Sequence, residues 1–459
     1  MTIHDIGQAR FLSGRQLFPY LRERLAQWRA GEHRLTQRMA GAAFIIRVAS
    51  AAIMFVSQVL LARWMGSGAF GSYVYVFTWL LLLGDLVHLG IPLTAQRYVP
   101  EYTQTGALAL LRGYLSGARW LTFGAATVAA IPGALIVWAL QASLDESLVL
   151  PFFFACVALP FYALTFMLDG LARSYNWINL ALLPQYILRP LLVIAGAGAL
   201  RAAGIALDAT VVMGVLAAAS VASAMIQLVQ IQRGLAHVVP VGAKIYAPRT
   251  WLAMSLPIIL VWGMYTLLTS TDVLVLKQFR PAEEVAYYYA AAKTLALMSI
   301  IHFAVSAAAA HRFTAFHVAG DRRGLAAFAA GTVRWIFWPS LAVCLLVLVV
   351  GKPLLSLFGA SFTAGYSVMA ILTVGQLARA AIGPAERLLN MLGQQRICAL
   401  AYAAAFLVNI VGCFLLAPAY GGAGAASATA AAFATESLLL FIIAKSRLGL
   451  HMFIWAPRA

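Results

Sequence analysis

Apolar runs of about twenty residues recur along the whole chain, separated by short polar or basic segments and by Gly and Pro turns. At 1.5 Å per residue, a helical run of that length crosses roughly 30 Å of hydrocarbon. The pattern therefore predicts an all-α polytopic membrane protein with about twelve transmembrane helices. We place them near residues 41–62, 72–95, 119–140, 148–169, 178–199, 209–231, 251–275, 286–309, 332–350, 365–389, 397–417 and 424–444.

The spans divide into two sets of six. Residues 61–73 and 276–288 share hydrophobic, turn and aromatic positions in register, which indicates a parallel repeat and two six-helix lobes. The predicted domains are a cytoplasmic basic amphipathic segment at 1–40, an N-lobe at 41–231, a cytoplasmic linker at 232–250, a C-lobe at 251–445 and a cytoplasmic tail at 446–459.

The N-terminal segment is polar and rich in arginine. Residues 15–38 can form an amphipathic helix with leucines and a tryptophan on one face, suited to an anionic membrane surface. A disordered basic tail that only sets the topology is an equal alternative. No cleavable signal peptide is apparent, so we expect the first span to act as the insertion signal.

The composition excludes a water-soluble core, because 63% of the residues are hydrophobic and only 10% are charged. The net charge of +17 does not indicate nucleic acid, since the basic residues are spread through the loops. Most of the 32 Lys and Arg residues fall on one side of the predicted layout. The positive-inside rule then places both termini in the cytoplasm. The four cysteines lie apart within apolar runs and read as core residues.

Charged side chains inside the spans are the strongest indication of function, because each costs free energy in hydrocarbon unless it is paired or faces a cavity. We take the basic ones, with one glutamine, as candidate substrate-binding residues, and the acidic ones as candidates for ion coupling. The substrate-binding candidates are Arg47, Arg189, Lys293, Arg379 and Gln376, and the ion-coupling candidates are Asp85, Asp272 and Glu436.

Helical spacing arranges several of these residues in stripes that could line a polar chamber between the lobes. Gln376, Arg379, Glu386 and Asn390 are predicted to share one face of the tenth span, and Thr266, Thr269 and Asp272 one face of the seventh. The balance of deep charges is mildly cationic, which suits an anionic group such as phosphate.

Structural roles remain open for these residues. Arg47 and Lys293 are close enough to span ends to snorkel, and Asp85 could belong to a buried Arg–Asp pair. Asp272 or Glu436 could simply hydrogen-bond between packed helices. His88 reads as a satisfied interior histidine.

Enzymatic signatures are missing from the sequence. There is no HExxH, GxxxxGK[ST] or GxSxG motif, so we expect neither an enzyme nor a cofactor or metal site. The glycine-rich run at 421–426 precedes a hydrophobic helix rather than following a strand, and is predicted to be a membrane turn.

Short motifs in a fixed order resemble the polysaccharide biosynthesis and export family. This is the O-antigen flippase-like branch of the multidrug/oligosaccharidyl-lipid/polysaccharide exporter superfamily. The motifs are residues 68–73 (GAFGSY), 89–92 (LGIP), 97–102 (RYVPEY), 271–274 (TDVL), 283–285 (EEV) and 418–426 (PAYGGAGAA).

The resemblance implies two six-helix lobes around a central cavity and alternating access without ATP hydrolysis. It implies a flippase that moves lipid-linked (undecaprenyl-pyrophosphate) oligosaccharide across the bacterial cytoplasmic (inner) membrane, for surface polysaccharides such as O-antigen, lipopolysaccharide or exopolysaccharide. Its partners would then be the lipid-linked oligosaccharide and membrane lipids, with glycan polymerase or assembly proteins as further candidates. The alternatives are a multidrug or small-cation antiporter of the same superfamily and, from another class, a membrane glycan polymerase or ligase.

Overall fold

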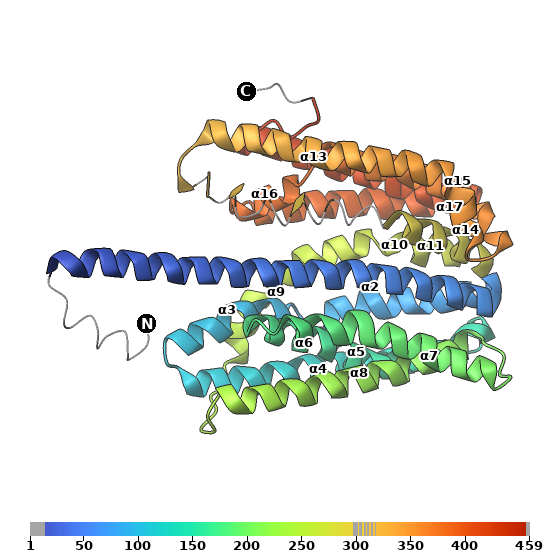
Figure 1. Ribbon diagram of the computed structural model, residues 1–459. Coiled ribbons are helices and arrows are strands. Elements are labelled where there is room, and N and C mark those ends of the chain that lie inside the picture. The colour runs from blue at the N-terminus through green and yellow to red at the C-terminus, as the bar shows by residue number, and fades with distance from the viewer. Residues whose placement is uncertain are drawn as a thin grey trace. The chain divides into compact units, whose positions relative to one another are not determined.

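The computed structural model describes residues 14–296 and 318–455, together with residues 302, 305, 306, 309, 312, 313, 315 and 316 between them. Within these ranges every regular element is a helix, and no strand is present (Figure 1). The chain forms two compact units, Met1–Val48 and Ala49–Ala459. The first contains the beginning of helix α2, and the second contains everything described below unless stated otherwise.

The helices of the first half have the following bounds. They are α2 (Gly14–Val87), α3 (Ile91–Gln104), α4 (Leu108–Leu140), α5 (Glu146–Ser174), α6 (Ile178–Leu183), the π-helix η1 (Pro184–Leu188), α7 (Arg189–Ala202) and α8 (Ala209–Val238). Helix α2 includes residues 15–38, where an amphipathic helix was one of the two alternatives.

The helices of the second half are shorter on average. They are α9 (Pro248–Leu268), α10 (Thr271–Phe279), α11 (Ala282–Ala296), α13 (Arg322–Val349), α14 (Gly351–Ser356), the 3₁₀-helix η2 (Ala360–Gly365), α15 (Tyr366–Ala381), α16 (Ala385–Met391) and α17 (Gln395–Leu448).

Nine segments of the described chain are long and apolar enough to cross a membrane. Two of these segments each contain two predicted spans, which lie on either side of a kink. The kink is at Gly66 in α2 and at Gly421 in α17. The predicted span 286–309 begins in α11 and continues into residues outside the described part. The prediction of an all-helical polytopic membrane protein is confirmed.

Two bundles make up the unit Ala49–Ala459 (Figure 1). In the N-lobe, α5 packs between α4 and α8, and α7 packs on α8. In the C-lobe, α17 packs against α10 and α15, and α15 packs against α13. Helix α9 contacts α3 on one side and α17 on the other, so it connects the two bundles.

The two lobes meet closely where α2 passes α11. A Cβ atom placed on Gly71 would lie 1.8 Å from the carbonyl oxygen of Ala282, so only glycine permits this approach. The ring of Phe70 packs edge-on against Tyr289 and Phe362, with centroids 6.2 and 6.0 Å away. We call this end of the unit the closed end, and the positive-inside prediction assigns it to the outer side of the membrane.

Two predicted helices are interrupted in the structure, and two predicted stripes are therefore wrong as continuous helical faces. The seventh span breaks between α9 and α10 at Thr269 and Ser270, before Asp272. The tenth breaks between α15 and α16, where Gly383 has φ 57° and Pro384 cannot continue a hydrogen-bonded helix. Glu386 and Asn390 thus belong to a different helix from Gln376 and Arg379.

Candidate functional site

Arg189 lies at the centre of a buried polar cluster in the N-lobe. It is the first residue of α7 and directly follows the π-helix η1. Pro184 is the first residue of η1, and Pro190 is the second residue of α7. Such π turns are frequent at functional positions. The Arg189 side chain is 8% exposed, and its guanidinium carbon lies 4.1 Å from the centre of the Tyr162 ring on α5. A cation–π contact of this kind partly offsets the loss of hydration.

The rest of this cluster comes from α2 and η1. Tyr73 is 2% exposed, with Gln58 and Arg189 beside it. Gln185 is 3% exposed and precedes Arg189 by four residues. No hydrogen-bond partner among the described residues reaches Arg189 Nη1, Gln58 Oε1 or Gln185 Oε1.

Asp85 links the N-lobe to α9. Its Oδ2 accepts a hydrogen bond of 3.3 Å from the Thr266 hydroxyl. His88, three residues after Asp85, is buried, and its Nδ1 accepts a hydrogen bond from the backbone N–H of Gly90 at 3.0 Å. His88 is therefore a satisfied interior histidine that caps the turn between α2 and α3.

Asp272 is buried in the C-lobe with three neutral donors. Its Oδ2 accepts from the Tyr288 hydroxyl at 2.6 Å and from the Thr429 hydroxyl at 3.3 Å. Its Oδ1 accepts from the backbone N–H of Val273. Asn409 Nδ2 donates to Thr429 at 3.0 Å, which extends the network to α17. The sequence placed Asp272 in the candidate set but gave no sign of these partners, because they come from three helices.

Lys293 and Tyr289 lie one turn apart on α11. The Lys293 ammonium is 4.8 Å from the centre of the Tyr289 ring, and it interacts electrostatically with Asp272. The lysine is half-buried, whereas Tyr289 is only 3% exposed.

Arg379 and Glu436 form an ion pair in the C-lobe, with Nε and Oε1 3.4 Å apart. Glu436 is 2% exposed, and the Arg379 guanidinium packs over the rings of Phe433 and Tyr265. Both residues were predicted functional candidates from different groups, and the structure brings them together. Sequence spacing could not reveal this pair because α15 and α17 are remote in the chain.

Two candidates remain, Gln376 and Arg47. Gln376 is half-buried on α15, one turn before Arg379. Arg47 is half-buried in α2 and belongs to the unit Met1–Val48, so it is described by itself.

Polar contacts join the two lobes at the closed end. Gln278 Nε2 donates to the Tyr75 hydroxyl at 2.9 Å, and Lys277 Nζ lies 3.8 Å from Asp145 Oδ2. Asp145 lies in the turn before α5. Hydrogen bonds from Ser147, with the ammonium of Lys277 nearby, hold the pKa of the Asp145 carboxyl below its ordinary value.

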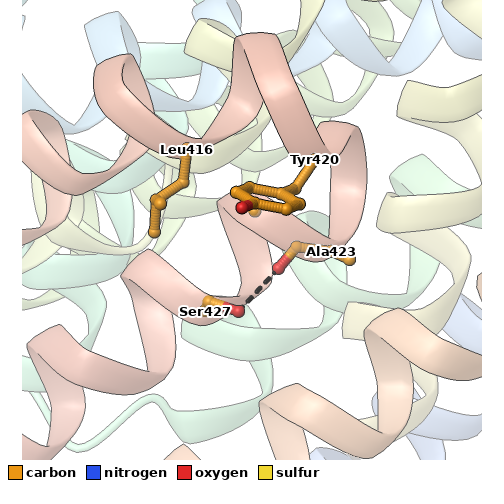
Figure 2. A pocket seen from close by; sticks show the side chains of 5 residues that line it. Leu416, Tyr420, Ala423 and Ser427 are labelled. Atoms are coloured by element: carbon orange, nitrogen blue, oxygen red, sulfur yellow. Dashed lines mark hydrogen bonds between the residues drawn. The ribbon is translucent and has the colours of Figure 1, made fainter.

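The kink of α17 carries a small surface hollow of about 230 Å³ (Figure 2). It is lined by Leu416, Tyr420, Ala423, Gly424 and Ser427, and the Ser427 hydroxyl donates to the Ala423 carbonyl at 2.8 Å. The lining contains no charged side chain, so this hollow does not belong to the candidate site. Within the described residues, no group of three or more His, Cys, Asp or Glu side chains could hold a metal ion.

Comparison with known proteins identifies the fold. A MatE family model matches residues 257–415. The search of curated proteins found no match.

Solved transporter structures align over most of the chain. The lipid II flippase MurJ in an inward closed conformation aligns with a TM-score of 0.70 and 14% identity, over 88% of this chain and 87% of that one. An inward-facing multidrug resistance MATE family transporter of the MOP superfamily aligns with a TM-score of 0.68 and 13% identity, over 88% and 98%. A MOP superfamily transporter from Pyrococcus furiosus, described as having a binding pocket of reverse polarity, gives 0.63 and 13%, over 89% and 94%.

These matches confirm the predicted two-lobed helical fold, while the superfamily and its polysaccharide export branch stay predictions. The protein thus shares the two-lobed helical fold of these solved membrane transporter structures.

Proposed function

We propose that this protein is a flippase that moves a lipid-linked oligosaccharide across the bacterial cytoplasmic membrane by alternating access, for surface polysaccharide biosynthesis. The substrate would carry an anionic diphosphate, as in undecaprenyl-pyrophosphate sugars. The observation that carries the proposal is the state of Arg189, which is buried and whose Nη1 has no hydrogen-bond partner among the described residues.

A buried arginine is costly unless its donors are satisfied. Arg379 meets this requirement through Glu436, at 3.4 Å. Arg189 contacts Tyr162 and lies near Tyr73, and no carboxylate among the described residues forms an ion pair with it. An arginine fork matches phosphate oxygens in geometry and charge, so a diphosphate is the ligand group that best fits Arg189.

Lys293 supports the same proposal from the C-lobe. It lies on Tyr289, which is close to both Tyr73 and Tyr162 of the N-lobe. One cation from each lobe thus stands near the place where the lobes meet. Both could contact the same diphosphate when the lobes move apart.

Ion coupling is assigned to Asp272 first, with Asp85 and Glu436 as further candidates. Neutral hydroxyls surround the Asp272 carboxyl, so a proton or monovalent cation could bind there in exchange with Lys293. Glu436 already has Arg379 as a partner, which makes it less suited to gain and lose an ion.

Reconstituted protein provides the test. Proteoliposomes containing a fluorescent undecaprenyl-pyrophosphoryl oligosaccharide are treated with an impermeant quencher, and the rate of transfer between leaflets is measured. We expect Arg189→Ala to lower the rate at least about tenfold, since a charge-assisted hydrogen bond contributes about 1.5–3 kcal/mol. Arg201→Ala is the matched control, because Arg201 is exposed at the other end of α7. An unchanged rate in an Arg189→Ala, Arg379→Ala double variant would rule out this substrate site.

A second candidate function is a multidrug or small-cation antiporter. The MatE match over residues 257–415 and the buried carboxyl of Asp272 favour it. Efflux of a lipophilic cation such as tetraphenylphosphonium from proteoliposomes, abolished by Asp272→Asn, would support this alternative. Transfer of the lipid-linked sugar without cation efflux would exclude it.

A further inference from the structure

The cluster around Arg189 contains unpaired acceptors as well as an unpaired donor. Gln58 and Gln185 are 4% and 3% exposed, and the amide oxygen of each lacks a hydrogen-bond partner among the described residues. Arg189 Nη1 lacks one too. A buried polar atom without a partner destabilises the state in which it occurs, so three of them beside one another call for a ligand or a rearrangement.

These three side chains belong to one site. Tyr73 lies next to both Gln58 and Arg189, and it also interacts with Tyr162, the ring on which Arg189 stacks. Gln185 precedes Arg189 by about one turn of a π-helix, so the two side chains project from nearly the same face.

The C-lobe covers this site in the present conformation. Tyr289 of α11 is buried close to Tyr73 and Tyr162, and its ring packs against Phe70. The lobes meet here through Gly71 and Ala282. Separation of the lobes at the closed end would withdraw Tyr289 and expose the three unpaired groups to a substrate.

The mixture of donor and acceptor selects the chemistry of that substrate. Phosphate oxygens accept hydrogen bonds, so they satisfy Arg189 but not a glutamine carbonyl. A hydroxyl group both donates and accepts, so hydroxyls serve the arginine and the two amides alike. The apolar face of a pyranose ring can in addition pack against a tyrosine ring.

We propose that Gln58 and Gln185, beside the diphosphate-binding Arg189, form a sugar subsite, which binds hydroxyl groups of the sugar attached to the diphosphate of the substrate. This inference rests on the proposed flippase function and refines it. The N-lobe would bind the sugar next to the diphosphate, and Tyr289 of the C-lobe would cover that sugar when the lobes close.

Two lipid probes test the subsite. Binding to the full-length protein in nanodiscs is measured for undecaprenyl pyrophosphate and for undecaprenyl-pyrophosphoryl-N-acetylglucosamine. We expect the wild type to bind the sugar-bearing lipid about tenfold more tightly, the value for two hydrogen bonds of ordinary strength. The Gln58→Leu, Gln185→Leu double variant should lose this preference and bind the bare diphosphate as the wild type does.

Matched variants guard against a general loss of structure. Gln227→Leu removes another buried glutamine, whose Nε2 donates to the Leu180 carbonyl in α6, and it should keep the sugar preference. Arg189→Gln should weaken binding of both lipids. If the double variant unfolds at a lower temperature than the wild type, the single variants Gln58→Met and Gln185→Met are measured instead. Each single variant should then keep half of the wild-type preference for the sugar-bearing lipid, expressed as the logarithm of the affinity ratio.

The outcomes separate the two proposals. A wild type that binds both lipids equally, or a double variant that keeps the preference, overturns the sugar subsite and leaves the flippase function standing. Equal loss of both lipids in the double variant also overturns the subsite. A wild type that binds neither lipid overturns the proposed function and the subsite with it.

Discussion

Gly71 offers the sharpest test of how the closed end is held together. Its α-carbon faces the backbone of Ala282, and an added Cβ would lie 1.8 Å from the carbonyl oxygen and 2.4 Å from the carbonyl carbon. Real Cβ atoms essentially never come within 3.0 Å of such atoms. Gly71→Ala therefore requires α2 and α11 to move apart by more than about 1 Å.

The cost of this substitution falls on one conformation only. Overpacking a tight contact costs about 1–3 kcal/mol, and the lobes no longer touch at Gly71 once the closed end opens. The equilibrium should therefore shift toward the open conformation by roughly 5- to 150-fold. The fold of each lobe is unaffected, because the contact lies between lobes.

Spin labels can report this shift directly. The native cysteines are replaced, and labels are attached at Glu146, the first residue of α5, and at Lys352 in α14, which are both exposed. Pulsed electron paramagnetic resonance then gives the distance distribution between the lobes. We expect a longer distance to gain population in Gly71→Ala.

Gly124→Ala is the matched control, since a Cβ on Gly124 in α4 would meet no atom within 4 Å. It should reproduce the wild-type distribution. If Gly71→Ala also reproduces it, the lobes do not depend on this close approach, and the account of the closed end is wrong.

Three further predictions follow from the charged groups. The pKa of Asp145 is lowered, so its attraction to Lys277 is present above the ordinary carboxyl value of about 4 and is lost as pH falls through the lowered one. The distance distribution should stay constant between pH 6 and 8, shift toward the open form in strong acid, and lose this response in Asp145→Asn. Arg379→Ala leaves the buried carboxylate of Glu436 without a partner and should destabilise the protein by about 3–5 kcal/mol, measured by thermal unfolding. Adding Glu436→Gln should restore most of the lost stability. If stability is not restored, Arg379 has another partner. Asp272→Asn should leave lipid binding intact but abolish the dependence of transport on an ion gradient, and transport that still follows the gradient would remove Asp272 from the coupling role.

Much of the fold could be predicted from the sequence because lipid imposes a simple pattern. The long apolar runs coincide with α4, α5 and α8, and the break within the α17 sequence falls at Gly421, in the predicted turn. The interruptions at Thr269 and at Gly383 were missed for the same reason. Apolar residues lie on both sides of each short break, and backbone geometry decides where the helix stops.

The candidate site was predicted only in part. Charge within an apolar run identified Arg189, Arg379 and Asp272, since any such residue stands out against its surroundings. It could not show that Arg379 meets Glu436, nor that Asp272 is surrounded by hydroxyls. Those facts depend on contacts between helices far apart in the chain.

Three uncharged members of the site were missed. Gln58, Tyr73 and Tyr162 look ordinary in sequence, since isolated glutamines and tyrosines are common in membrane helices. The only signal available was Gln185, one turn before Arg189. Their importance appears only when their hydrogen-bond partners are sought in three dimensions.

The kink at Gly421 has a practical consequence for anyone who adds a tag to this protein. The backbone N–H of Gly422 donates to the Glu284 carboxylate, and Arg280 donates to the carbonyls of Ala417 and Pro418. These hydrogen bonds fix the turn between the last two predicted spans in place, so the turn is not a free loop. An epitope or reporter inserted there would break these hydrogen bonds and displace the turn.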